Sequence, residues 1–90
     1  MALPKHTQSM IEYVSDFTTG NLSRMFFDLD YSYYVIERFP KMERENAGIA
    51  QLYADTIDAA YNQCSGKDDL ECMEIMKRAL KDFVEQVDEG

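Results

Sequence analysis

The chain is predicted to fold as a small antiparallel four-helix bundle of the all-α class, and three observations predict it. Apolar residues recur every three or four positions along the sequence, and no segment alternates like a strand. The 90 residues include only 2 Pro and 4 Gly and are 46% hydrophobic, which is the composition of a globular chain. Short connections join the periodic segments and favour antiparallel neighbours. A chain of this length forms a single domain around one modest core.

The first helix is predicted at about residues 7–18. Its apolar positions, Met10, Val14 and Phe17, are four and three residues apart, as the inner face of an amphipathic helix requires. Gly20 follows and can adopt the left-handed conformation that often ends a helix.

The second helix is predicted at about residues 22–39, with Asn21 or Ser23 as its cap. Pro40 should end it, because an interior proline removes a backbone hydrogen bond and clashes with the preceding turn. One arc about 100° wide is apolar and is predicted to be the core face. This arc contains Leu22, Met25, Phe26, Leu29, Tyr33 and Ile36.

A second apolar stripe lies almost opposite that arc, at Phe27, Tyr31 and Tyr34. It needs its own cover, which can be the N-terminal tail, a neighbouring helix or a partner chain. Tyrosine is enriched at interface hot spots because it buries a large area while its hydroxyl stays hydrogen-bonded. We therefore expect Tyr31 and Tyr34 to anchor a partner, with an acidic rim at Asp28, Asp30 and Glu37.

The third helix is predicted at about residues 42–62, and its outer face carries Asp55 and Asp58 one turn apart. Such a pair usually marks a solvated surface, and it is also a candidate partner contact. The inward stripe falls within one narrow arc. Its members are Met42, Asn46, Ile49, Tyr53, Ile57, Ala60 and Cys64.

The fourth helix is predicted at about residues 69–87, after a turn at residues 65–67. Asp68 or Asp69 opens it, since a carboxylate suits the positive end of the helix dipole. Together with Glu71, these two aspartates form a second candidate contact patch. The predicted core face comprises Leu70, Met73, Met76, Leu80, Phe83, Val84 and Val87.

The acidic charge is concentrated in the second half of the chain. Residues 42–90 contain 12 Asp and Glu against 5 Lys and Arg, whereas residues 1–41 contain 5 against 4. A net charge of −8 argues against nucleic acid or an anionic membrane as partner, because both require cationic side chains. It favours a cationic protein, whose association it would accelerate. The alternative is that the acidity only maintains solubility.

Cys64 and Cys72 are expected to be reduced, packed thiols. The N-terminal residues lack the apolar run of a signal peptide, and no segment approaches the length of a membrane span. This predicts a cytoplasmic protein, in which disulfides are rare. Two cysteines without further Cys or His ligands nearby do not predict a zinc site.

The inventory of reactive residues argues against an enzyme. The single histidine, His6, falls in the predicted N-terminal tail, where it cannot be held against a nucleophile. The sequence has no glycine-rich phosphate loop and no paired histidine motif for a metal. We therefore expect no catalytic residues, no metal and no cofactor.

The segment FTTGNLSRMFF at residues 17–27 resembles the first helix junction of the colicin D type immunity proteins. That family includes antitoxins against contact-dependent growth inhibition toxins. In it an aromatic ends the first helix, a glycine follows, and an aliphatic-serine pair opens a helix with Phe four residues on. Those positions are occupied here by Phe17, Gly20, Leu22, Ser23 and Phe27.

The resemblance implies an immunity protein that binds a cationic toxin nuclease, often a tRNase, and occludes its active-site groove. Carboxylates on a helical scaffold would take the place of RNA phosphates. Two other classes stay open. A phage-encoded mimic of nucleic acid that inhibits a defence nuclease would be equally acidic. A homodimeric adaptor module would pack Phe27, Tyr31 and Tyr34 against the same residues of a second copy.

Overall fold

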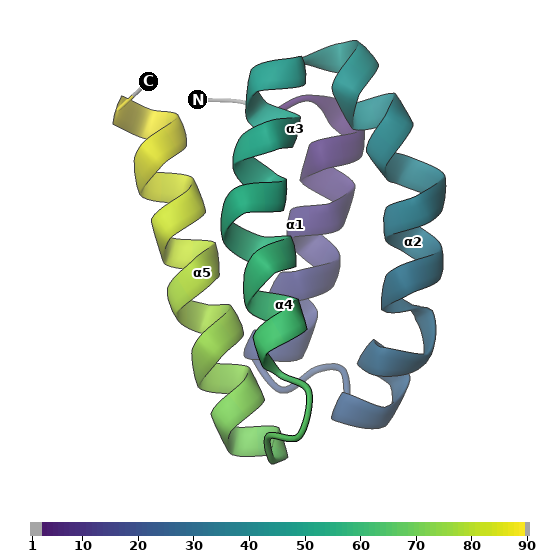
Figure 1. The fold of residues 1–90 in the computed structure, drawn as a ribbon, viewed down its shortest axis with the longest axis vertical. Coiled ribbons are helices and arrows are strands. Elements are labelled where there is room, and N and C mark those ends of the chain that lie inside the picture. Colours follow the sequence, from purple (N-terminus) through teal and green to yellow (C-terminus); the bar gives the residue numbers. More distant parts are fainter. Residues whose placement is uncertain (1–2, 90) are drawn as a thin grey trace.

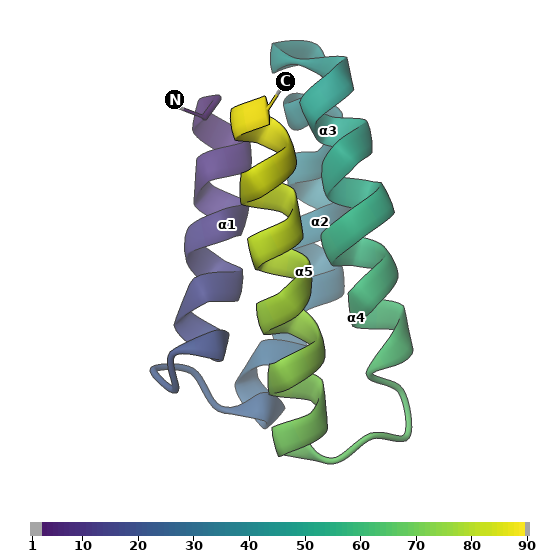
Figure 2. The same cartoon turned by 90° about the vertical axis from the view of Figure 1, so that its left-hand side faces the viewer.

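Four helical columns form an up-down bundle in the computed structural model, which describes residues 3–89 (Figure 1). The all-α bundle predicted from the periodicity is confirmed. Each column packs against two neighbours, so the bundle closes around a single core (Figure 2). The elements are α1 (Lys5–Thr18), α2 (Arg24–Glu45), α3 (Ala47–Tyr53), η1 (Ala54–Asp58), α4 (Ala59–Gln63) and α5 (Asp69–Glu89). The third column is α3, the π-helical segment η1 and α4, which follow one another without a break.

The helix boundaries follow the predicted caps at most ends. Gly20 has φ +87° after α1, and Gly66 has φ +78° in the turn before α5, so both adopt the left-handed conformation that favours glycine. Ser23 caps α2 by accepting a hydrogen bond from the backbone amide of Phe26 at 3.3 Å. Asp68 accepts one from the amide of Glu71 at 2.8 Å and opens α5.

The prediction that Pro40 ends the second helix is wrong. α2 continues through Pro40 to Glu45, and Figure 1 shows its last turns bending toward α3. Pro40 lies on the exposed side of the helix, where water can hydrate the carbonyl that loses its amide partner. Met42 beyond it is buried and continues the inner face, which compensates for the lost bond. Asn46, predicted as a core position, is exposed and caps α3 through the amide of Ile49.

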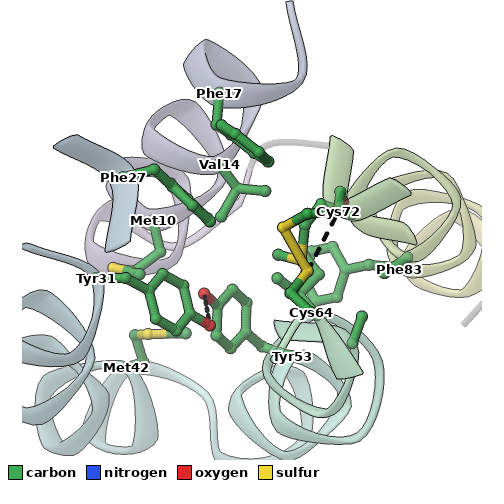
Figure 3. Close-up of a cluster of buried hydrophobic side chains, with 14 of the residues drawn as sticks. Met10, Val14, Phe17, Phe27, Tyr31, Met42, Tyr53, Cys64, Cys72 and Phe83 are labelled. Atoms are coloured by element: carbon green, nitrogen blue, oxygen red, sulfur yellow. Dashed lines mark hydrogen bonds between the residues drawn. A yellow bond between two sulfur atoms is a disulfide. The ribbon is translucent and has the colours of Figure 1, made fainter. Parts of the chain in front are cut away.

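The core draws on all four columns (Figure 3). The predicted inner positions of α1 and most of those on the third column are confirmed. On α5 the predictions for Leu70 and Val84 are wrong, since both are exposed, and Cys72 and Ala79 are buried in addition to Met76, Phe83 and Val87. The buried apolar residues are Met10, Val14, Phe17, Phe27, Tyr31, Met42, Ala50, Tyr53, Ile57, Ala60, Cys64, Cys72, Met76, Ala79, Phe83 and Val87.

The assignment of core and surface stripes on α2 is also wrong, because the two faces are exchanged. Phe27 and Tyr31 are 0% and 1% exposed. The aromatic stripe faces inward because it completes a stack: the Phe27 ring lies 4.2 Å from that of Phe17, and the Tyr31 ring 3.9 Å from that of Tyr61. The stripe predicted to be core therefore faces outward, except for Leu22, which is half-buried and packs against the core.

Two smaller expectations also fail. Cys64 and Cys72 form a disulfide with their Cα atoms 4.9 Å apart, so the prediction of reduced thiols is wrong. They meet because Cys64 lies at the end of α4 and Cys72 in the first turn of α5, on either side of a short turn. His6 lies within α1 and not in a tail, and its backbone amide donates to Oε1 of Glu45 at 2.9 Å.

Candidate interaction surface

Five of the seven exposed large hydrophobic residues in the described part of the chain lie on the outward face of α2. Its members are spaced four, four and three residues apart, so they form one stripe along the helix, with Phe26 beside it. We call this set the outer α2 stripe. Its members and their exposed fractions are Met25 (74%), Phe26 (57%), Leu29 (71%), Tyr33 (63%) and Ile36 (76%).

Carboxylates border the outer α2 stripe along one edge. Asp30 and Glu37 project from α2 at positions adjacent to the stripe, and both are exposed. Neither belongs to an ion pair within residues 3–89. The pKa of Tyr33 is raised by its hydrogen bond to Glu37 and by the charge of that carboxylate. The predicted acidic rim at Asp30 and Glu37 is therefore exposed, and it borders a different stripe from the one expected.

Asp28, the third predicted rim residue, is engaged within the protein. Its carboxylate accepts hydrogen bonds from Arg24 Nε at 2.8 Å and from the Tyr61 hydroxyl at 3.1 Å. Burial, followed by the charge of Asp28, raises the pKa of Tyr61 to about 12. Arg24 also donates to the backbone carbonyls of Cys64 at 3.1 Å and Lys67 at 3.0 Å. This set of bonds ties the start of α2 to the turn before α5, so part of the charge of Asp28 is already neutralised.

Tyr31 cannot anchor a partner, because it is buried. Its hydroxyl donates to Oδ1 of Asp58 at 3.0 Å. The same hydroxyl lies 3.1 Å from the hydroxyl of Tyr53, and Figure 3 shows this second bond. Since the Tyr31 proton points to the carboxylate, the Tyr53 hydroxyl is the donor in the second bond. Burial raises the pKa of both tyrosines well above the ordinary value. These bonds satisfy the buried hydroxyls of Tyr31 and Tyr53.

Asp58 consequently does not share an exposed face with Asp55, as the sequence suggested. Asp58 is half-buried and turns toward Tyr31, whereas Asp55 is exposed and accepts a hydrogen bond from Gln51 Nε2 at 2.9 Å. Asp55 lines a shallow hollow between the third column and α5, together with Arg78 and Asp82. Of the predicted pair, Asp55 alone is placed to meet a partner.

Tyr34 is half-buried at the seam between α1 and α2. Its ring packs edge-on against Tyr13 at 4.8 Å between centroids, and the Arg38 guanidinium lies 4.5 Å from the ring centre. The side chain thus closes the edge of the core. With Phe27 and Tyr31 buried, the interface predicted for a homodimer through these three aromatics is wrong.

The second candidate patch lies at the turn before α5, close to Asp28. Asp68 is occupied as the cap of α5, and Asp69 lies 3.7 Å from Arg24. Glu71 is exposed in the first turn. Arg24 therefore brings the start of α2 and the start of α5 together at one end of the bundle. Asp30 and Glu37 lie further along α2, and Asp55 lies on the third column.

The sequence reasoning missed Met25, Leu29 and Ile36 as surface residues. Their periodicity and hydropathy match a core face, so the pattern alone ranks them first for burial. No signal within α2 distinguishes the two stripes, because the partners that bury Tyr31, the hydroxyl of Tyr53 and the carboxylate of Asp58, lie on another column.

Within residues 3–89, no group of three His, Cys, Asp or Glu side chains is arranged to hold a metal ion. No helix in this part of the chain is both long enough and apolar enough to cross a membrane. A comparison with known families finds no matching family, and comparisons with curated proteins and with solved structures find no match either.

Proposed function

We propose that the protein is an immunity protein, an antitoxin that binds the cationic active-site groove of a cognate bacterial toxin nuclease. The nuclease would be a tRNase, and inhibition would be steric and electrostatic, without turnover. The observation that carries the proposal is the surplus of carboxylates that the protein does not neutralise itself. The net charge is −8, and the ion pairs within residues 3–89 use only Asp28, Asp69, Glu74 and Glu85.

A ribonuclease must present Lys and Arg to the phosphates of its substrate, so a rigid acidic surface can compete for the same groove. Asp30 and Glu37 support this role best, because both are exposed on one long helix and unpaired within the described chain. Asp55 and the Asp68–Glu71 end of α5 are additional contacts in the proposal. Asp28 contributes less, since Arg24 lies against it. The likeness of residues 17–27 to the immunity family supports the same class.

The test is co-expression with each basic protein encoded by a neighbouring open reading frame as the candidate toxin. We expect cells that make the toxin to survive only when they also make this protein. Purified protein in excess over the toxin should protect tRNA from cleavage. Cleavage that continues at full excess, with no complex on a sizing column, would refute the immunity role. Recovery of a large nucleic-acid-guided complex from the host, and of no toxin, would favour the mimic of nucleic acid instead.

Charge reversal gives a matched pair of variants. D30K/E37K and E74K/E85K change the net charge by the same amount, the first on α2 and the second on α5. We expect the α2 pair to weaken toxin binding by about tenfold or more, and the α5 pair by less than about threefold. Equal effects of the two pairs would mean that net charge alone matters and would remove Asp30 and Glu37 as specific contacts.

The proposed compartment is the cytoplasm, where a tRNase finds its substrate. The Cys64–Cys72 disulfide bears on this proposal, because disulfides persist mainly in oxidising compartments. Alkylation of thiols at the moment of cell lysis, followed by mass measurement, distinguishes the states. Two alkylated cysteines would show that the disulfide is absent in cells and would support the cytoplasm. A pair that is alkylated only after reduction would indicate an oxidising compartment and count against the cytoplasm.

A further inference from the structure

We propose that the outer α2 stripe is a docking surface for a protein partner that presents an apolar ridge bordered by Lys or Arg. The inference rests on the proposed function only for the identity of that partner, because the chemistry of the surface is independent of whether the partner is a toxin. It replaces Tyr31 and Tyr34, the anchors expected from the sequence, with the apolar residues that the fold leaves exposed.

The first step is that the bundle does not use this face. The inner side of α2 already supplies Phe27, Tyr31 and Met42 to the core. The stripe from Met25 to Ile36 spans three helical turns, about 16 Å at 1.5 Å per residue. Soluble monomers rarely expose a contiguous apolar patch of this kind unless a partner covers it.

The second step is the charge along the border. Asp30 and Glu37 lie on one edge of the stripe and Asp28 on the other, and no Lys or Arg lies between residues 25 and 37. A partner that covers the stripe must therefore place its rim against carboxylates. Lys or Arg at that rim gains attraction, whereas Asp or Glu adds repulsion.

The third step excludes a second copy as the occupant. Asp30 is level with the midpoint of the stripe between Met25 and Ile36. An antiparallel two-fold pairing centred on the stripe places the same edge of both copies together, and so sets Asp30 beside Asp30. A parallel two-fold pairing sets Asp30 against the opposite edge, where Asp28 lies beside Arg24 and keeps part of its charge. Either arrangement brings like charges together, between two chains that each carry −8.

The probe for the test is a synthetic amphipathic helix with leucines along one face and lysines along both edges. A control peptide has glutamate in place of every lysine. The protein carries its own reporters: with ¹³C-methyl methionine, Met25 lies on the stripe, whereas Met10, Met42 and Met76 are buried. We expect the lysine peptide to shift the Met25 methyl signal and to leave the three buried ones unchanged. The glutamate peptide should bind at least about tenfold more weakly, and added salt should lower the affinity of the lysine peptide for the protein.

Variants separate the stripe from general stickiness. The L29S/I36S variant lacks two exposed apolar side chains of the stripe, and it should bind the lysine peptide about tenfold or more weakly than the wild type does. V84S alters an exposed apolar side chain on α5 and should leave the affinity unchanged. Any one of three results would overturn the inference. They are a Met25 methyl signal that the lysine peptide does not shift, equal affinity for the two peptides, and an affinity for the lysine peptide that L29S/I36S does not change. A protein that is dimeric as wild type and monomeric as L29S/I36S would show that a second copy occupies the stripe.

The toxin assay distinguishes this inference from the proposed function. Toxin inhibition that survives L29S/I36S unchanged would show that the toxin is not the partner of the outer α2 stripe, and it would retain the immunity role. Binding of the lysine peptide at Met25, with no protection against the toxin, would retain the docking surface and refute the immunity role.

Discussion

Both faces of α2 carry an apolar stripe, but only one of the two stripes is buried. The inner face carries Phe27 and Tyr31, which are buried, and the outer face carries Leu29 and Ile36, which are more than two-thirds exposed. The inner residues find ring partners on α1 and the third column, and a hydroxyl partner in Asp58. The outer residues find no partner within the bundle. The difference shows that hydrophobicity makes a face eligible for the core, and that specific partners on the neighbouring helices decide which eligible face is buried.

Truncation of one residue on each face should give the largest contrast. Phe27→Ala removes a ring stacked on Phe17 and leaves a cavity, so we expect a loss of about 3–5 kcal/mol in the free energy of unfolding. Ile36→Ala removes an exposed side chain and should change it by less than about 0.5 kcal/mol. Urea unfolding followed by circular dichroism measures both. A comparable loss in the two variants would contradict the observed orientation of α2.

The tyrosines offer a finer contrast, because one lies on each face. Tyr31→Phe removes the hydroxyl that donates to Asp58 and accepts from Tyr53, and should cost about 1–2 kcal/mol. Tyr33→Phe removes a hydroxyl on the exposed stripe and should cost less than about 0.5 kcal/mol. The same unfolding measurement applies. If the Tyr31 variant is as stable as wild type, the buried hydroxyl bonds do not orient the helix.

Arg24 connects the start of α2 to the turn before α5, so its removal should loosen that end of the bundle. The Arg24 side chain is 15% exposed and donates to three backbone carbonyls as well as to Asp28. We expect Arg24→Ala to cost about 1 kcal/mol after allowance for solvent screening, and Arg44→Ala, on exposed α2 surface, to cost almost nothing. Hydrogen exchange at residues 64–69 checks the location. Faster exchange there in the Arg24 variant alone is the expected result.

Alkaline pH should weaken the inner face selectively. The pKa of Tyr61 is raised to about 12, and burial raises the pKa of Tyr31 and Tyr53 further. Because the folded state retains protons that the unfolded state releases, this stabilisation is fully present below pH 10. It is lost as the pH rises from the ordinary tyrosine value through the folded one. Absorbance of tyrosinate, recorded with circular dichroism, should show these residues ionising together with unfolding. Complete ionisation of all tyrosines in a native bundle would contradict their burial.

The short-range features of the fold were predictable because their causes lie within one helical turn. Gly20 and Gly66 supply the left-handed residues, and Ser23 and Asp68 cap the helices that follow them. These are contacts between residues close in the chain, so their sequence signals survive any tertiary arrangement. Pro40 was the exception, because the helix beyond it is maintained by the burial of Met42 in the core.

The candidate site was predictable only in part. The exposure of Asp30 and Glu37 was predictable, since charged side chains remain at the surface on either orientation of the helix. Tyr31 and Asp58 were misplaced, because a bond between α2 and the third column removes both from the surface. No local signal marks that bond.

By itself, the sequence determined the helices, most of their ends and the acidic surplus. The tertiary structure decided which stripe of α2 is buried, the inward turn of Asp58 and the joining of Cys64 to Cys72. The physical reason is one of range. Propensity, capping and net charge depend on residues near in the chain, whereas the choice between two apolar faces depends on ring and hydroxyl partners supplied by other helices.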